Sequence, residues 1–111
     1  MYLLIRTLKK RYVGFRLTSD SVHSRRKVST LVLNELYSSL SGHEKMMRVR
    51  LLDYNVEKGL GMLLCDHKSV DKIRDVFNNI QDQNHGTMTI HVLGVSGTIK
   101  ALKRKFLSEM G

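Results

Sequence analysis

The chain has 111 residues, of which 41% are hydrophobic and 26% charged, the balance of one globular domain with its own core. That composition excludes an intrinsically disordered chain, and no apolar run approaches the roughly 20 residues of a membrane span. The net charge of +9 is uneven: residues 1–27 contribute +7, residues 28–86 contribute −1 and residues 87–111 contribute +3. If the fold brings the two basic ends together, they indicate a polyanion-binding surface. If it does not, they are two basic termini exposed to solvent.

The first half of the chain predicts a strand, a helix and a second strand. Residues 11–18 alternate as a half-buried strand does, with the apolar positions Val13, Phe15 and Leu17. Ser24 is a cap residue for a helix that ends at Ser41 and Gly42, and residues 46–53 alternate again. The apolar stripe of this helix consists of Val28, Leu31, Val32, Leu36 and Leu40.

The second half predicts a hairpin partner, a helix, a strand and a last helix. A turn at residues 54–59 leads into an apolar strand at residues 60–66. Asp66 can cap a second helix, residues 81–86 are a polar loop, and residues 87–93 alternate as a fourth strand. The inward apolar positions are Val70, Ile73, Phe77 and Ile80 in the second helix, Met88, Ile90 and Val92 in the strand, and Ile99, Leu102 and Phe106 in the last helix.

This order of elements is the βαββαβ pattern of ferredoxin-like and RRM-like folds, followed by one extra helix. We therefore predict an α/β (α+β) sandwich with a four-stranded antiparallel sheet. Residues 1–111 form one domain, and residues 1–10 are its basic N-terminal segment. The extra C-terminal helix is a candidate to cover the sheet face that an RRM leaves open.

The stretch GVSGTIKALKRKFL at residues 94–107 joins a glycine-rich helix start to four cations. A helix start offers unpaired N–H groups to an anion, and a cation in the first turns, such as Lys100, is unfavourable for the helix dipole unless an anion is bound. The pattern is not a Walker A loop, and a solvated amphipathic face is the alternative. The predicted phosphate-binding residues are Ser96, Gly97, Thr98, Lys100, Lys103 and Arg104.

Two further basic stretches are candidate contacts for nucleic acid. The first helix begins with three cations where the dipole favours acids, and a phosphate bound there would resolve the conflict. The N-terminal segment places cations before Tyr12, as suits phosphate contact and stacking in RNA. Neither central RRM signature is present, however, so base stacking across the sheet is not expected. The residues concerned are Arg25 and Arg26 in the helix, and Arg6, Lys9, Lys10 and Arg11 in the segment.

Patterns typical of catalysis or metal binding are weak. The histidines are scattered, without metal-ligand spacing to Cys65 or to one another, at positions 23, 43, 67, 85 and 91. Asp71 and Asp75 lie beside cations, as on a solvated helix face. A single cysteine forms no internal disulfide, which fits a reducing compartment and predicts a cytoplasmic location. We predict no catalytic residue, no metal site and no bound cofactor for this chain.

Three stretches of the chain carry a family resemblance. VLGVSGTIKALKRKFL at residues 92–107 closely resembles the C-terminal signature of the archaeal ribonuclease P protein component 2 family, which has a eukaryotic counterpart. KRYVGFRLTSD at residues 10–20 resembles that family's first strand, and GLGMLLCDHKSVDKIRDVF at residues 59–77 its third strand and second helix. Residues 21–58 match less well, since the helix start at residues 25–27 is basic where acids are expected.

The resemblance implies an RRM-like, non-catalytic subunit of ribonuclease P, the endonuclease that removes the 5′ leader of precursor tRNA. It implies that the RNA subunit carries the Mg²⁺-dependent chemistry and that precursor tRNA is contacted indirectly. It also implies a TIM-barrel-like partner, ribonuclease P protein component 3, in a heterotetramer with two copies of each protein. The anion expected at residues 96–104 would then be the backbone of the enzyme's own RNA.

Other functions remain open from the residues alone. A stand-alone RRM-like module for single-stranded RNA requires aromatic side chains on an open sheet face, where Tyr12 is the clear candidate. A small enzyme acting on a phosphate ester requires a catalytic group near the 94–98 turn, where only His91 is close in sequence. Attachment to an anionic membrane requires a helix that joins a basic face to a large aromatic one, and none is predicted.

Overall fold

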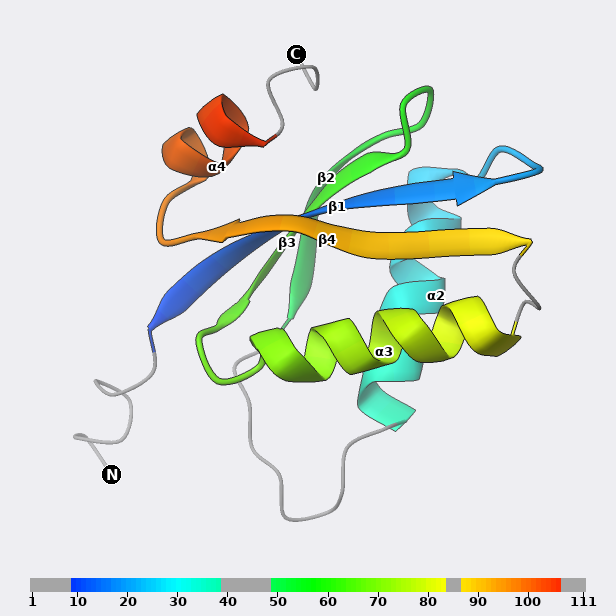
Figure 1. The fold of residues 1–111 in the computed structure, drawn as a ribbon, viewed down its shortest axis with the longest axis horizontal. Helices are drawn as coiled ribbons and strands as arrows, with labels where there is room; N and C mark the ends of the chain where they lie inside the picture. Colours follow the sequence, from blue (N-terminus) through cyan, green and yellow to red (C-terminus); the bar gives the residue numbers. More distant parts are fainter. Residues whose placement is uncertain (1–8, 39–48, 84–86, 107–111) are drawn as a thin grey trace.

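The computed structural model describes residues 9–38, 49–83 and 87–106. All strands in this part of the chain form one antiparallel sheet in the order β2-β3-β1-β4. The predicted α+β class and the βαββαβ order with a C-terminal helix are confirmed (Figure 1). The elements are β1 (Lys10–Ser19), α2 (Arg25–Ser38), β2 (Arg50–Asn55), β3 (Leu60–Asp66), α3 (Val70–Gln83), β4 (Met88–Ser96) and α4 (Ile99–Lys105).

Three element ends differ from the sequence-based predictions. Tyr54 belongs to β2 rather than to a turn, because its ring is buried and stacks against Phe15 with centroids 6.3 Å apart. α3 continues to Gln83, into the predicted polar loop. β4 continues to Ser96, because its end pairs with Tyr12 of β1. The predicted helix stop at residues 41–42 and the start of the second strand lie outside the described residues.

The two predicted helix caps have different outcomes. Ser24 caps α2 as predicted, since its hydroxyl oxygen accepts a 3.2 Å hydrogen bond from the Lys27 amide. Asp66 does not occupy the cap of α3, which begins only at Val70. Its carboxylate instead accepts 2.9 Å bonds from the Lys68 amide and the Ser69 hydroxyl, and so closes the turn that precedes the helix.

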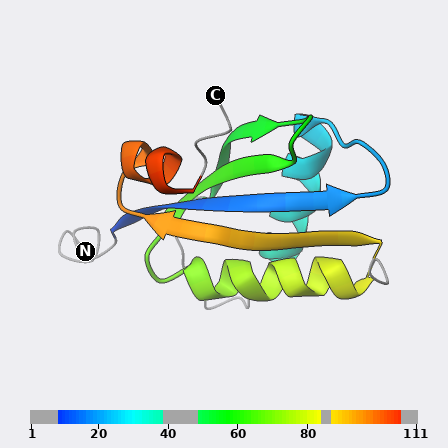
Figure 2. The same ribbon diagram turned by 45° about the horizontal axis from the view of Figure 1, so that its top comes forward.

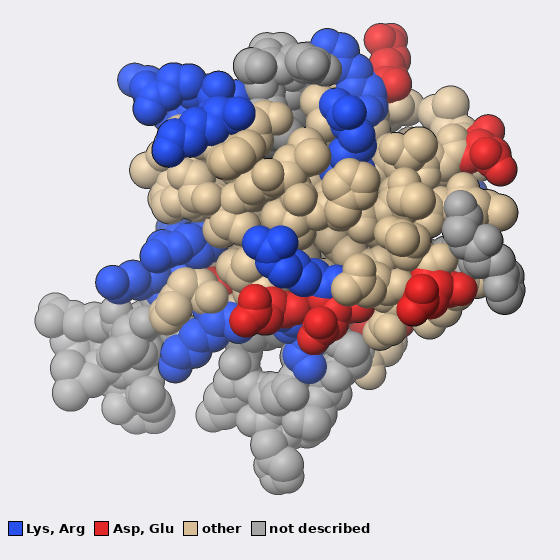
Figure 3. All heavy atoms as spheres, in the orientation of Figure 1, with Lys and Arg blue, Asp and Glu red and all other residues tan. Residues whose placement is uncertain are grey.

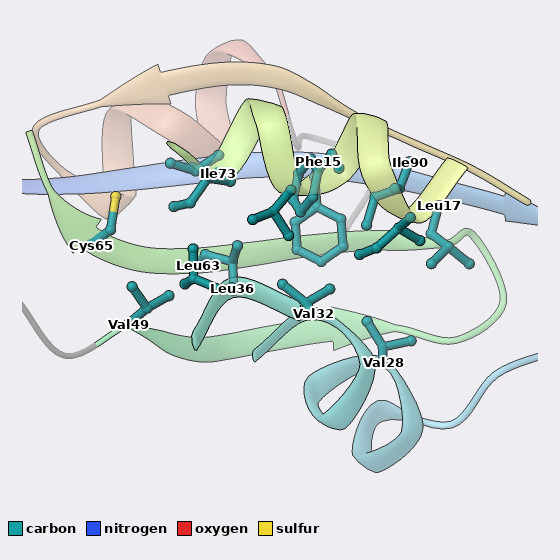
Figure 4. Close-up of a cluster of buried hydrophobic side chains, with 14 of the residues drawn as sticks. Phe15, Leu17, Val28, Val32, Leu36, Val49, Leu63, Cys65, Ile73 and Ile90 are labelled. Carbon is teal, nitrogen blue, oxygen red and sulfur yellow. The ribbon is translucent and has the colours of Figure 1, made fainter. Parts of the chain in front are cut away.

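The main core lies between α2, α3 and one face of the sheet. Val28, Val32 and Leu36 of α2 are buried at a spacing of four residues, which places them on one side of the helix. They meet Phe15 of β1, whose ring also contacts Phe77 of α3 with centroids 5.5 Å apart (Figure 4). The predicted inward positions that lie within the described part of these strands and helices therefore form one contiguous core, while Leu40 lies outside it.

α4 lies against the opposite face of the sheet, and α3 and α4 stand on either side of it (Figure 2). Leu102 of α4 is fully buried against Leu60 and Met62 of β3, and these three residues form a second, smaller cluster. The C-terminal helix thus covers part of the face that an RRM uses for bases. Ile99 is 39% exposed, so its predicted inward position was wrong. Phe106 is 41% exposed, but its ring lies on Gly94 of β4, so its predicted inward position was correct in part.

Two β-bulges supply this second cluster with extra apolar side chains. Pairing of β1 with β4 passes from Gly14–Gly94 to Phe15–Val92, so Leu93 is an additional residue on β4. Pairing of β2 with β3 skips Leu52 in the same way. A bulge reverses the alternation of side chains beyond it. Leu52 and Leu93 therefore face α4, while their neighbours before the bulge pack into the main core.

Candidate nucleic-acid interface

The fold brings the two basic ends of the chain to the same end of the sheet. The last residue of β4, Ser96, pairs with Tyr12 near the start of β1. The Arg11 guanidinium lies beside the following loop, with Nη1 3.8 Å from the position that a Cβ would take at Gly97. The condition for a shared polyanion surface is therefore met by residues 9–11 and 96–105, while Arg6 lies outside the described residues.

The hydroxyls predicted to hold phosphate also hold the loop and the helix start. Thr98 is the cap of α4, and its Oγ1 accepts a 3.2 Å hydrogen bond from the Ala101 amide. The Ser96 hydroxyl accepts a bond of 3.3 Å from the Thr98 amide. Each hydroxyl keeps its own hydrogen to donate, so a neighbouring phosphate oxygen remains a possible acceptor. Gly97 is exposed between them.

All four cations of α4 are exposed. Lys100 is the second residue of the helix, as predicted, where the dipole disfavours it. Lys103, Arg104 and Lys105 lie in the last turn, where the dipole favours cations without any ligand. Only Lys100 therefore lies where the helix dipole disfavours a cation, as the sequence indicated. The positions of the other three cations are explained equally well by the dipole without any ligand.

The start of β1 is fixed by His67, one of the scattered histidines to which sequence analysis assigned no role. The Lys9 amide donates to Nδ1 of His67 at 3.1 Å, and the His67 amide donates to the Lys9 carbonyl at 2.8 Å. This pair of bonds fixes the backbone of Lys9, and the side chains of Lys9 and Lys10 are exposed at this end of the sheet. Arg11 is half-buried and donates from Nη1 to the Lys10 carbonyl at 2.8 Å. No sequence pattern indicates the role of His67, because its partner is distant along the chain.

The basic start of α2 is separate from this surface. α2 follows the end of β1, whereas the Lys9–Arg11 stretch lies at its beginning, and ten strand residues extend over about 30 Å. Arg25 is exposed but bonded to β2, since its Nη2 donates to the carbonyls of Leu51 and Leu52 at 3.3 and 3.2 Å. It thereby holds the bulge of β2, which accounts for a cation at this helix start. Arg26 is exposed and lines an open cavity of about 740 Å³ along α2.

Charge is unevenly distributed over the molecule (Figure 3). Lys and Arg side chains gather over α4 and at the end of the sheet where β1 begins, whereas Asp and Glu lie mainly along α3. We call the first group the cationic end and define it as Lys9, Lys10, Arg11, Lys100, Lys103, Arg104 and Lys105.

The described residues offer little for catalysis. No group of three or more His, Cys, Asp or Glu side chains within residues 9–38, 49–83 and 87–106 is placed to hold a metal ion. Cys65 is fully buried, and burial raises the pKa of its thiol to about 12, with Asp66 adding to the rise and Arg11 opposing it. A thiol held neutral in this way is a poor nucleophile. Within the same ranges no helix is long and apolar enough to cross a membrane.

Comparison with known proteins places the chain in a family. The model of the Rpp14/Pop5 family matches residues 11–107. The chain is 34% identical over 110 residues to ribonuclease P protein component 2 of Pyrococcus abyssi, a match that covers 93% of this chain and 88% of the relative. The component 2 proteins of Methanosarcina mazei and Pyrococcus furiosus are 35% and 33% identical, with 93% of this chain covered in each case and 88% and 87% of the relative. The chain therefore belongs to the Rpp14/Pop5 family of ribonuclease P protein subunits.

Proposed function

We propose that this chain binds the RNA of ribonuclease P through its cationic end and supports that RNA in removing the 5′ leader of precursor tRNA. Family membership supports the assignment to ribonuclease P. The observation that carries the RNA contact is the pairing of β1 with β4, which joins two basic stretches distant in sequence into one surface. A cationic surface of this kind binds the phosphate backbone of a folded RNA without reading its sequence.

The mechanism is neutralisation of phosphate charge. Lys100, Lys103 and Arg104 contact phosphates on one side, and Lys9, Lys10 and Arg11 on the other. Each phosphate contact releases condensed counterions and lowers the repulsion between neighbouring RNA strands. The RNA then reaches its active fold, with its own Mg²⁺, at a lower Mg²⁺ concentration. In this proposal the RNA carries the chemistry, and the chain contributes neither a catalytic group nor a bound cofactor.

The proposal extends to the partner and the location. The family resemblance favours pairing with the TIM-barrel-like component 3 in a heterotetramer with two copies of each protein. A buried cysteine whose thiol is held neutral is compatible with a reducing compartment, and we place the protein in the cytoplasm. The stand-alone RRM-like alternative loses support, because α4 occupies part of the sheet face and Tyr12 packs beneath it.

Cleavage of precursor tRNA at limiting Mg²⁺ tests the proposal. Reconstituted ribonuclease P RNA and the partner subunit receive the wild-type chain, the triple variant Lys100/Lys103/Arg104→Ala, or the control Lys27/Lys58/Arg74→Ala. The control removes the same charge from exposed positions outside the cationic end. We expect the wild type and the control to restore cleavage and the triple variant to fail. Equal rescue by all three would move the RNA contact away from α4, and no rescue by any would favour a stand-alone RNA-binding protein.

The salt dependence of RNA binding gives a second readout. If about five phosphates are contacted, the logarithm of the association constant should fall against the logarithm of salt concentration with a slope of roughly −3 to −5. Removing three of those cations should reduce the slope by about 2 to 3, and the control variant should leave it unchanged. A wild-type slope near zero would contradict phosphate binding altogether.

A further inference from the structure

Phe106 at the end of α4 is exposed in an unusual setting. Its side chain is 41% exposed, although the apolar stripe of α4 predicts an inward position and Leu102 of the same stripe is fully buried. An aromatic ring left in water forgoes much of the stabilisation that burial would supply. A ring that keeps this much of its surface exposed is available to a ligand.

The ring is nevertheless held in a defined place. A Cβ at Gly94 of β4 would collide with Cγ, Cδ2 and Cε2 of Phe106, so the ring lies directly on the glycine backbone. The Phe106 amide donates to the Leu102 carbonyl at 2.9 Å and ends the helix. One side of the ring is thus covered by β4, and the remaining exposed surface faces away from the strand. Such a ring is ordered before any ligand arrives.

The surroundings of the ring favour nucleic acid over protein. Lys103 precedes Phe106 by three residues, the spacing of neighbours on a helix surface, and Arg104 and Lys105 follow Lys103 directly. All three are exposed. The centre of a protein–protein interface is depleted in lysine, whereas an aromatic ring beside cations is the arrangement that binds a base and its phosphates together.

We propose that Phe106, seated on Gly94, is a stacking platform for one unpaired base of RNA, whose flanking phosphates contact Lys103 and its neighbours. This inference rests on the proposed RNA-binding function and adds that the RNA is single-stranded at this point. An RRM stacks bases on its sheet. Here α4 covers part of that face and carries the aromatic side chain itself.

Binding of two RNAs by the full chain tests the platform. Fluorescence anisotropy compares a short oligoadenylate with a blunt RNA duplex of the same length, at one fixed salt concentration. We expect Phe106→Leu to weaken oligoadenylate binding by about five- to fiftyfold and duplex binding by less than about twofold. Phe106→Tyr, which keeps the ring, should restore most of the affinity, and the salt slope should not change because no cation is lost.

Tyr37→Leu is the matched control, since Tyr37 is an equally exposed aromatic residue, at 46%, on α2. It should bind both RNAs as the wild type does. Unchanged oligoadenylate binding by Phe106→Leu, or an equal loss for both RNAs, would overturn the platform and leave the proposed function standing. If the wild type bound neither RNA, the proposed function would fail first and the platform with it. If Phe106→Leu bound both RNAs normally but failed to restore cleavage in the assay with the partner subunit, the ring would be a protein contact. That result would overturn the platform.

Discussion

The face of the sheet that packs against α2 and α3 is closed by two helices of 14 residues each, whereas the opposite face is partly covered by the seven residues of α4. The first face follows the alternation of the strands closely. The second depends on two bulges that turn Leu52 and Leu93 toward α4. One face is therefore built for stability, while the other holds a short cationic helix in place.

This difference separates folding from binding within a small domain. All four cations of α4 are exposed, and the helix is fixed to the sheet mainly by Leu102 and the ring of Phe106. Changes on the α4 face should alter RNA binding before they unfold the domain. Changes on the other face should unfold the domain first. Four substitutions test how stability depends on the two faces, from the largest expected effect to the smallest.

Phe15→Ala should have the largest effect on stability. Phe15 is fully buried and contacts both Tyr54 and Phe77, so its removal leaves a cavity at the centre of the main core. We expect the free energy of unfolding to fall by about 3–5 kcal/mol, measured by urea denaturation. A loss below about 1 kcal/mol would show that the main core does not dominate stability.

Leu102→Ala should cost less and act locally. The residue is equally buried, but it belongs to the small cluster on the α4 face. The loss of global stability should be at most about 2–3 kcal/mol, because α4 can detach while the sheet and the other helices stay folded. Hydrogen exchange should show lost protection in α4 and retained protection in α3. Uniform loss over both helices would contradict two separable faces.

Cys65 makes stability sensitive to alkaline pH through the main core. The pKa of its thiol is about 12 in the folded chain, against roughly 8.5 when unfolded. Between these values only the unfolded chain gives up the proton, so the free energy of unfolding should be intact below about pH 8 and fall by roughly 1.4 kcal/mol per pH unit above about pH 9. The free energy of unfolding is compared between pH 8 and pH 10, in the wild type and in Cys65→Ala. If both lost stability equally, other groups would account for the change.

Arg25→Met should have the smallest effect. It removes two hydrogen bonds from the guanidinium to the bulge carbonyls of β2, and their exposure limits the cost to about 0.5–1 kcal/mol. Arg26→Met, one residue later and exposed, is the control and should be neutral within about 0.5 kcal/mol. Equal losses in both variants would mean that the two hydrogen bonds of Arg25 make no specific contribution.

Elements whose apolar residues recur at a regular spacing were predicted correctly from the sequence. The alternation in β1 and the stripe of α2 were correct because both elements bury one face against the same core. The bulges were not predictable, because Leu51–Leu52 and Val92–Leu93 are adjacent apolar pairs that look the same in any register. The position of Phe106 was predicted only in part, because its contact is with Gly94, twelve residues earlier and on another element.

The candidate interface was predicted in part. Net charge and its placement at the two ends indicated a shared surface, and strand pairing brings those ends together. The role of Arg25 was not visible, since the carbonyls that it binds lie on β2, far along the chain. His67 was missed for the same reason, because a histidine that fixes a backbone segment leaves no local pattern.

The pairing of Tyr12 with Ser96 also orders events during synthesis. β1 leaves the ribosome first, but its partner β4 begins only after 68 further residues, which take roughly 3–14 seconds at usual elongation rates. Until then β1 has an unpaired edge, which a chaperone or another strand can occupy. A chain that stops before β4 also lacks α4, and with it Lys100, Lys103 and Arg104 of the proposed RNA contact.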